Sequence, residues 1–120
     1  MVPSGSPCRP RVYRAVFVEA NQKSFLTLVE NLRALDAGPQ AVLHRMDAVK
    51  YATRLAEREF DVAFADPPYR LGLAEEIARL WLATPFAGVL GIEHEKQVEL
   101  PEGGDRRVYG DTVVTFYRRP

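Results

Sequence analysis

The sequence predicts an α/β protein with a mostly parallel sheet, helices on the faces of the sheet and an antiparallel hairpin at its C-terminal end. Short apolar runs alternate with amphipathic helical stretches, a pattern typical of βαβ crossovers and parallel strands. The last part of the chain changes to two strand-like runs, 106–110 and 112–118, joined tightly at Gly110-Asp111. At 120 residues with 47% apolar content, the chain is long enough for one core.

Four apolar runs predict the strands that precede the hairpin: 14–19, 41–45, 60–66 and 88–93. Val62 to Ala65 are consecutive apolar residues, the pattern of a strand covered on both faces. Pro67 and Pro68 lack a backbone N–H and fix φ near about −65°, so the strand must end before them. Asp66 is therefore expected at a strand's carboxyl end, where open α/β sheets bind their ligands.

Three helices are expected between these strands. Asn21 is a suitable N-cap for the first, and Gly38-Pro39 would end it. Asp47 would open the second helix. Apolar residues at three- and four-residue steps give each helix one face to bury: Phe25, Leu28, Val29, Leu32 and Leu35 in the first, Ala48, Tyr51, Ala52 and Leu55 in the second, and Leu73, Ile77, Leu80 and Trp81 in the third.

Composition excludes several classes of function. Sixteen basic and sixteen acidic residues balance, so any contact with nucleic acid must be local. Arginines do cluster at both ends of the chain, where a solvated rim explains them equally well: Arg9, Arg11 and Arg14, then Arg106, Arg107, Arg118 and Arg119. One cysteine and two separated histidines form neither a disulfide nor a zinc set. Without a membrane span or signal peptide in the sequence, we expect a soluble protein of the reducing cytoplasm.

The tetrapeptide Asp66-Pro67-Pro68-Tyr69 behind a buried strand resembles the target-amine motif of S-adenosylmethionine-dependent methyltransferases that modify exocyclic amines of adenine or guanine. Two further stretches narrow the resemblance. Tyr109-Gly110-Asp111-Thr112, and Val16-Phe17-Val18-Glu19 followed by a helix with Asn31-Leu32, are similar to the RsmD-type methyltransferases, which methylate N2 of a guanine in 16S ribosomal RNA. The likeness covers about residues 14–118, the later part of the family's domain.

The resemblance implies an incomplete Rossmann-like domain over 13–120, behind an irregular or disordered segment 1–12. The family's domain begins with a strand, a glycine-rich turn and a helix, and Ser4-Gly5-Ser6 is no substitute because it follows no strand. The absent strand would lie mid-sheet, between the strands at Val16 and Val62. Residues 8–15 or a second chain could fill the gap, and the apolar edges favour self-association. We favour a truncated or misassigned start.

By this resemblance, Asp66, Pro67, Pro68 and Tyr69 form the catalytic set. The Asp66 carboxylate and the Pro67 carbonyl would accept hydrogen bonds from the amine, and so favour the tetrahedral, positively charged nitrogen that develops in methyl transfer. Tyr69 would stack on the extruded base, a contact that contributes about 1–3 kcal/mol. A rigid turn with a capping aspartate and a packed aromatic is the simpler alternative.

The cofactor set implied by the resemblance is Glu19 with Ala20 at the ribose, Asp47 with Ala48 at the adenine, and Asp66. Glu19 is equally a surface acid before a helix, and Asp47 equally an N-cap. Three more residues are noted without a catalytic role: Arg70, Glu93 and His94. Arg70 would reach a phosphate or remain an exposed charge, whereas Glu93 and His94 would line the same crevice or, for the histidine, be satisfied by its neighbours.

The expected function is therefore S-adenosylmethionine-dependent methyl transfer to guanine N2 in 16S rRNA or in the assembling small subunit, impaired where the glycine-rich turn is absent. Neither a metal nor a membrane is expected to take part. Two alternatives stay open: a non-catalytic module that binds RNA or a partner, and a DNA adenine-N6 methyltransferase, because the four-residue motif does not separate the two bases.

Overall fold

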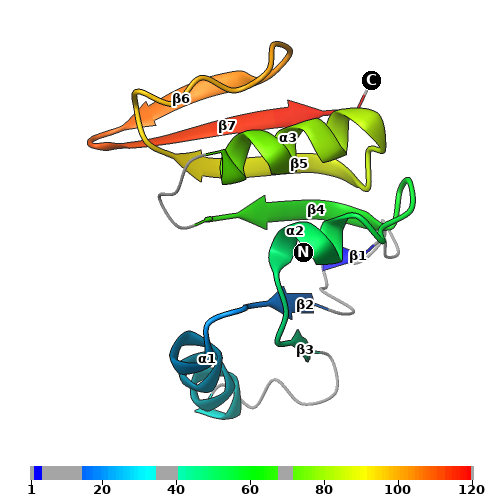
Figure 1. The fold of residues 1–120 in the computed structure, drawn as a ribbon, viewed down its shortest axis with the longest axis vertical. Helices are drawn as coiled ribbons and strands as arrows, with labels where there is room; N and C mark the ends of the chain where they lie inside the picture. The colour runs from blue at the N-terminus through cyan, green and yellow to red at the C-terminus, as the bar shows by residue number, and fades with distance from the viewer. Residues whose placement is uncertain (1, 4–14, 35–40, 68–71, 120) are drawn as a thin grey trace, which may run out of the picture.

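The computed structural model describes residues 2–3, 15–34, 41–67 and 72–119, and Figure 1 shows their arrangement. The predicted strands, helices and hairpin are all present in it, but the second helix is shorter than expected and ends before Leu55. The elements are β1 (Val2–Pro3), β2 (Ala15–Val18), α1 (Gln22–Ala34), β3 (Ala41–His44), α2 (Ala48–Ala52), β4 (Phe60–Ala65), α3 (Leu73–Ala83), β5 (Ala87–His94), β6 (Asp105–Tyr109) and β7 (Thr112–Arg118).

The strands form two sheets. The larger is five-stranded, in the order β1-β4-β5-β7-β6, and the smaller pairs β2 with β3. The pairs β2–β3 and β4–β5 are parallel, whereas β7 is antiparallel to both β5 and β6. The predicted α/β class with its closing hairpin is confirmed, but the parallel strands do not belong to one continuous sheet.

The break between the sheets lies between β2 and β4, where the resemblance places the absent strand. Val2 and Pro3 occupy part of this position as β1, antiparallel to β4 in the register Val2↔Val62 and Pro3↔Phe60. Two residues of the segment expected to be irregular are thus a short strand, and residues 4–12 lie outside the described part. Only two residues of β1 pair with the six-residue strand β4, so β1 replaces only part of the absent neighbouring strand.

One core joins the two sheets. It lies between α2, α3 and one face of the strands, and Val16 of β2 belongs to it. Trp81 of α3 anchors this core because its indole N–H donates a 2.8 Å hydrogen bond to the Ala87 carbonyl and its ring lies 5.8 Å from that of Tyr117. The other buried members are Ala52, Leu55, Phe60, Ala63, Ala74, Ile77, Ala78, Phe86, Leu90 and Ile92.

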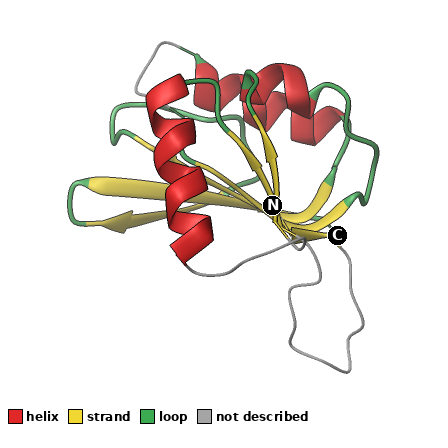
Figure 2. Ribbon diagram, turned by 90° about the horizontal axis from the view of Figure 1, so that it is seen from below, coloured by secondary structure: helices red, strands yellow, loops and turns green. Residues whose placement is uncertain are grey.

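The opposite face of β4 is open, which corrects the prediction that Val62 to Ala65 are covered on both sides. Val62 is 45% exposed and Phe64 55% exposed. Figure 2 shows α2 and α3 together on one side of the larger sheet. The ring of Phe64 lies beside that of Phe116 over Gly91, where an added Cβ would be 3.0 Å from one ring and 3.1 Å from the other. The apolar run predicted burial on both faces of β4, but the described helices bury only one of them.

Hydrogen bonds from backbone N–H groups to nearby side chains cap the N-termini of α1 and α2. Asn21 Oδ1 accepts a 2.9 Å hydrogen bond from the Ser24 N–H and so caps α1, as predicted. The predicted stop at Gly38-Pro39 lies outside the described residues. The expected apolar stripe of α1 is only half-buried at Phe25, Leu28 and Val29. None of the described helices is both long and apolar enough to cross a membrane.

Two phenylalanines of β4 differ in exposure and test whether Phe64 is open to solvent. Phe60 is 1% exposed, so Phe60→Ala should lower the free energy of unfolding by about 3–5 kcal/mol. Phe64→Ala, the same change on the open face, should cost at most about 1 kcal/mol because little buried area is lost. Urea unfolding of both variants measures the difference. Equal losses would mean that a further layer covers Phe64 in solution.

Candidate active site

Asp66 follows β4 directly and its side chain is exposed, while Pro67 is half-buried. The predicted catalytic partners Pro68 and Tyr69, and the neighbouring Arg70, lie outside the described residues. The arrowheads of β2, β4 and β5 point to the same side of the molecule (Figure 1), so the residues that follow these strands share one end of the fold. Asp66 is thus placed at a carboxyl strand tip, as the two prolines predicted.

Glu93 lies beside Asp66. Strand β4 pairs in parallel with β5 through Ala65↔Ile92, and the next residue on each strand is one of these two acids. A hydrogen bond between the two side chains, and then the negative charge of Asp66, raises the pKa of Glu93 above its usual value, with a smaller contribution from burial. The sequence placed Glu93 near the crevice, but the contact with Asp66 follows only from the register.

His94 points to the other face and takes no part in this pair. It is 2% exposed, and its ring bridges the Glu95 carbonyl, 2.9 Å from Nδ1, and the Thr115 hydroxyl, 2.7 Å from Nε2. Because a carbonyl only accepts, Nδ1 carries the hydrogen and Nε2 accepts from the hydroxyl. Of the two interpretations left open, the structure supports a histidine satisfied by its neighbours.

Glu19 follows β2 at the same end of the fold. Its backbone N–H donates a 3.0 Å hydrogen bond to the His44 carbonyl, which extends the β2–β3 pairing by one residue. Its carboxylate is half-exposed and has no hydrogen-bond partner within the described residues, and Ala20 beside it is exposed. A carboxylate in this state can accept two hydroxyl donors, so it fits the ribose of a nucleoside cofactor.

Asp47 is the N-cap of α2, as predicted. Its Oδ1 accepts hydrogen bonds from the Val49 N–H at 2.8 Å and from the Lys50 N–H at 3.1 Å. Both bonds use the same oxygen, so the cap leaves Oδ2 available to an amine donor such as that of adenine. Ala48, the first residue of α2, is exposed. Capping and cofactor contact are therefore compatible at this carboxylate.

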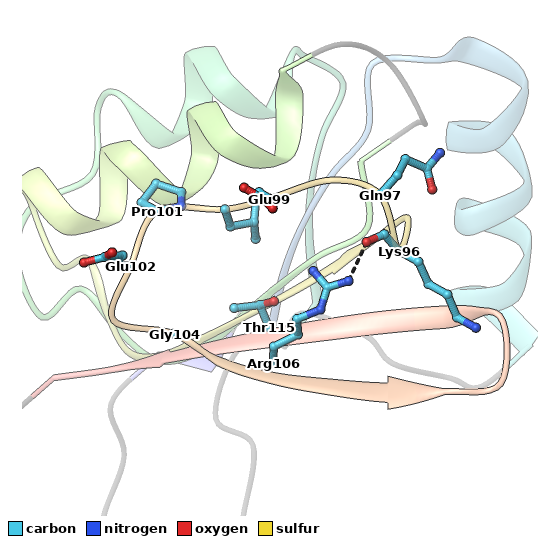
Figure 3. A pocket seen from close by; sticks show the side chains of 9 residues that line it. Lys96, Gln97, Glu99, Pro101, Glu102, Gly104, Arg106 and Thr115 are labelled. Atoms are coloured by element: carbon cyan, nitrogen blue, oxygen red, sulfur yellow. Dashed lines mark hydrogen bonds between the residues drawn. The ribbon is translucent and has the colours of Figure 1, made fainter.

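A pocket of about 430 Å³ lies away from these acids, between the loop after β5 and the hairpin (Figure 3). The Arg106 guanidinium closes part of it by donating to the carbonyls of Lys96 and Val98. None of the predicted site residues that the structure describes lines this pocket, so it provides no cavity for Asp66. In the described part of the chain, no three of His, Cys, Asp and Glu gather as metal ligands.

Parallel strands that carry acids at their carboxyl tips, followed by an antiparallel hairpin, define the later part of a Rossmann-like methyltransferase fold. Residues 8–118 match the sequence model of the family described as Conserved hypothetical protein 95. The chain belongs to this family, which is that of the RsmD-type proteins.

Among curated relatives, the Bacillus subtilis (strain 168) protein named "Putative rRNA methyltransferase YlbH" is 33% identical over 119 residues, which cover 87% of this chain and 62% of that protein. The chain thus spans less than two thirds of this relative's length.

Solved structures share the fold. The "Putative methyltransferase yhhF" of Escherichia coli superposes with a TM-score of 0.72 at 24% identity, over 90% of this chain and 63% of that one. A conserved hypothetical protein of Streptococcus pyogenes gives 0.75 at 26% identity, over 90% and 72%. A hypothetical protein of Thermus thermophilus gives 0.71 at 30% identity, over 88% and 63%.

The two hydrogen bonds that Asp47 accepts predict different effects for two substitutions at this position. Asp47→Ala removes both cap bonds and should lower the free energy of unfolding by about 0.5–2 kcal/mol. Asp47→Asn keeps a capping oxygen and should change it by less than about 0.5 kcal/mol. Urea unfolding measures both. A large loss for the asparagine variant would show that the charge, rather than the cap, is what the fold needs.

Proposed function

We propose that this chain acts in S-adenosylmethionine-dependent methyl transfer to the exocyclic N2 amine of a guanine in 16S rRNA, and that it supplies the groups that accept the amine. The observation that carries the proposal is Asp66-Pro67 at the carboxyl tip of β4, in a chain of the RsmD family. The name of the Bacillus subtilis relative supports ribosomal RNA as the substrate class.

The chemistry explains why a carboxylate and a carbonyl are needed together. The lone pair of an exocyclic amine is delocalised into the purine ring, so the nitrogen is a poor nucleophile. Asp66 and the Pro67 carbonyl each accept one N–H, which draws the nitrogen towards tetrahedral geometry and stabilises its developing positive charge. Neither acceptor has to be a strong base, because the amine becomes acidic only on methylation. Tyr69, as the resemblance implies, would hold the base by stacking.

The cofactor, when bound, supplies a methyl group on a positively charged sulfur. Glu19 would accept the two ribose hydroxyls, and Asp47 would accept an adenine N–H at the oxygen that the α2 cap leaves available. Glu19 follows β2 and Asp47 follows β3 of the smaller sheet, whereas Asp66 follows β4 of the larger one. Cofactor binding by this chain would therefore draw on both sheets.

A second candidate function is a non-catalytic module that binds RNA or a protein. The open apolar face at Val62 and Phe64 favours it, because exposed apolar surface of this kind marks interaction sites. DNA adenine-N6 methylation is the third possibility, and the choice of substrate tests it.

The decisive variant is Asp66→Asn. At saturating cofactor, it should lower methyl transfer to guanine-containing RNA by about 100-fold or more, as the loss of a preorganised charge-stabilising group does elsewhere. Asp61→Asn, an exposed aspartate on the same strand, is the matched control and should leave the rate unchanged. Transfer of labelled methyl groups to RNA measures both.

The substrates separate the alternatives in the same assay. RNA with inosine in place of guanosine lacks the N2 amine and should accept no methyl group. Methylation of adenine in DNA would replace the guanine proposal, and unchanged transfer by Asp66→Asn would reject Asp66 as the acceptor.

Affinity for the cofactor gives a separate test. The sequence contains no G-x-G-x-x-G motif, whose backbone N–H groups hold the cofactor in dinucleotide-type folds. We expect the chain to bind S-adenosylmethionine more weakly than micromolar by calorimetric titration, and Glu19→Gln to weaken binding further. Micromolar affinity would show that Glu19 and Asp47 suffice, and an unchanged affinity of Glu19→Gln would remove Glu19 from the cofactor site.

A further inference from the structure

We propose that Glu93 and Asp66 act as one proton-sharing pair across the tips of β5 and β4, and that Glu93 thereby sets the pH range in which Asp66 serves the substrate amine. Glu93 reaches no reacting atom in this scheme, so it is a positioning residue that acts through Asp66. The proton sharing is a property of the chain alone, while its effect on transfer rests on the proposed function.

The geometry of the pair is set by backbone pairing rather than by flexible side chains alone. The ladder between β4 and β5 runs from Phe60↔Ala87 to Ala65↔Ile92, so the following residues continue side by side on adjacent strands. Asp66 shares its face of β4 with Phe64, and Glu93 shares its face of β5 with Gly91, over which the Phe64 ring lies. The two carboxyl groups therefore project on the same, open side of the sheet.

Few other charges face Glu93. On β7 its register partner is the neutral Val114. Beyond it on β6, Arg107 pairs with Val114, but its guanidinium is held by Asp105 at 2.9 Å. The neighbouring His94 lies on the opposite face in its own hydrogen bonds. Among the described residues, Asp66 is the only charged group that shifts the pKa of Glu93.

Asp66 makes the Glu93 carboxyl group hold its proton to higher pH. The pKa of Glu93 is raised from 4.5, first by the hydrogen bond to Asp66 and then by its negative charge. The folded chain therefore retains a proton on the pair at pH values where a separate glutamate has lost it. As the pH rises from 4.5 through the raised pKa, the pair loses this proton and becomes able to accept one from the substrate.

Methyl transfer releases one proton, and the pair is placed to take it. When the amine nitrogen bonds to the methyl carbon, the carbon–sulfur bond breaks and its electron pair stays on sulfur. The nitrogen then carries a positive charge and gives one of its protons to Asp66, which shares it with Glu93. Transfer should therefore fall as the pH drops through the raised pKa of Glu93, because the pair is then already protonated.

Carboxyl-carbon NMR of the isotope-labelled full chain tests the pair without cofactor. The Glu93 signal, assigned by its loss in Glu93→Gln, should titrate above 4.5, and its midpoint should fall towards 4.5 in Asp66→Asn. Asp66 is exposed, so Asp66→Asn should fold. Glu59→Gln, an exposed glutamate at the other end of β4, is the matched control and should leave the Glu93 midpoint in place. A midpoint that is the same with and without the Asp66 carboxylate would overturn the proposal.

The pH profile of methyl transfer tests the consequence. In Glu93→Gln the acid limb should move to lower pH, because the variant lacks the carboxyl group whose pKa is raised, while the rate at the plateau should fall less than tenfold. An unmoved limb would overturn the role of Glu93 even if the NMR result holds. Failure of the unaltered chain to transfer methyl groups at any pH would instead count against the proposed function, and the NMR titration would still decide whether the pair exists.

Discussion

The parallel pairing of β4 with β5 is the constraint on which the rest of the structure depends. It supplies the surface on which α2 and α3 pack, through Ala63 of one strand and Leu90 and Ile92 of the other. The same register puts Asp66 and Glu93 side by side. Because side chains alternate along a strand, a slip of one residue would turn Glu93 into the core and His94 onto the open face. The hydrogen bond between His94 and Thr115 and the burial of Ile92 therefore also hold the acid pair in place.

The two halves of the candidate site are held by different forces. Glu93 lies on β5 and Asp66 follows β4 of the same sheet, so the β4–β5 ladder sets their relative position. Glu19 and Asp47 follow strands of the other sheet, which joins the first mainly through packing of Val16 in the common core and through the short strand β1. Side-chain packing tolerates small displacements more readily than a hydrogen-bonded ladder does. Asp66 and Glu93 are therefore the better-defined half of the candidate site in this chain.

Sequence reasoning succeeded where the cause was local. The prolines after Asp66 ended β4, Asn21 and Asp47 capped their helices through bonds within three residues, and Gly110 with a φ of 62° formed the hairpin turn that its sequence predicted. Sequence reasoning failed where a feature depends on contacts between segments that are far apart in the chain. The apolar run Val62 to Ala65 shows that cover is needed but not whether the chain provides it on both faces. The contact between Asp66 and Glu93 depends on a register that no local pattern encodes.

Exposure of Asp66 shapes how such a site can work. In the free chain, water screens the charges at the strand tip, and an exposed hydrogen-bonding group contributes little to catalysis while water competes for it. The pKa of Glu93 is raised even so, because Asp66 is a hydrogen-bond partner and a like charge beside it. A base stacked at the tip of β4 would displace that water and lower the local dielectric constant. The hydrogen bond from the amine to Asp66 would then be stronger, and so would the hydrogen bond that shares a proton between Asp66 and Glu93. In the proposed function, the substrate base therefore excludes the water that would otherwise weaken the interactions needed for its own methylation.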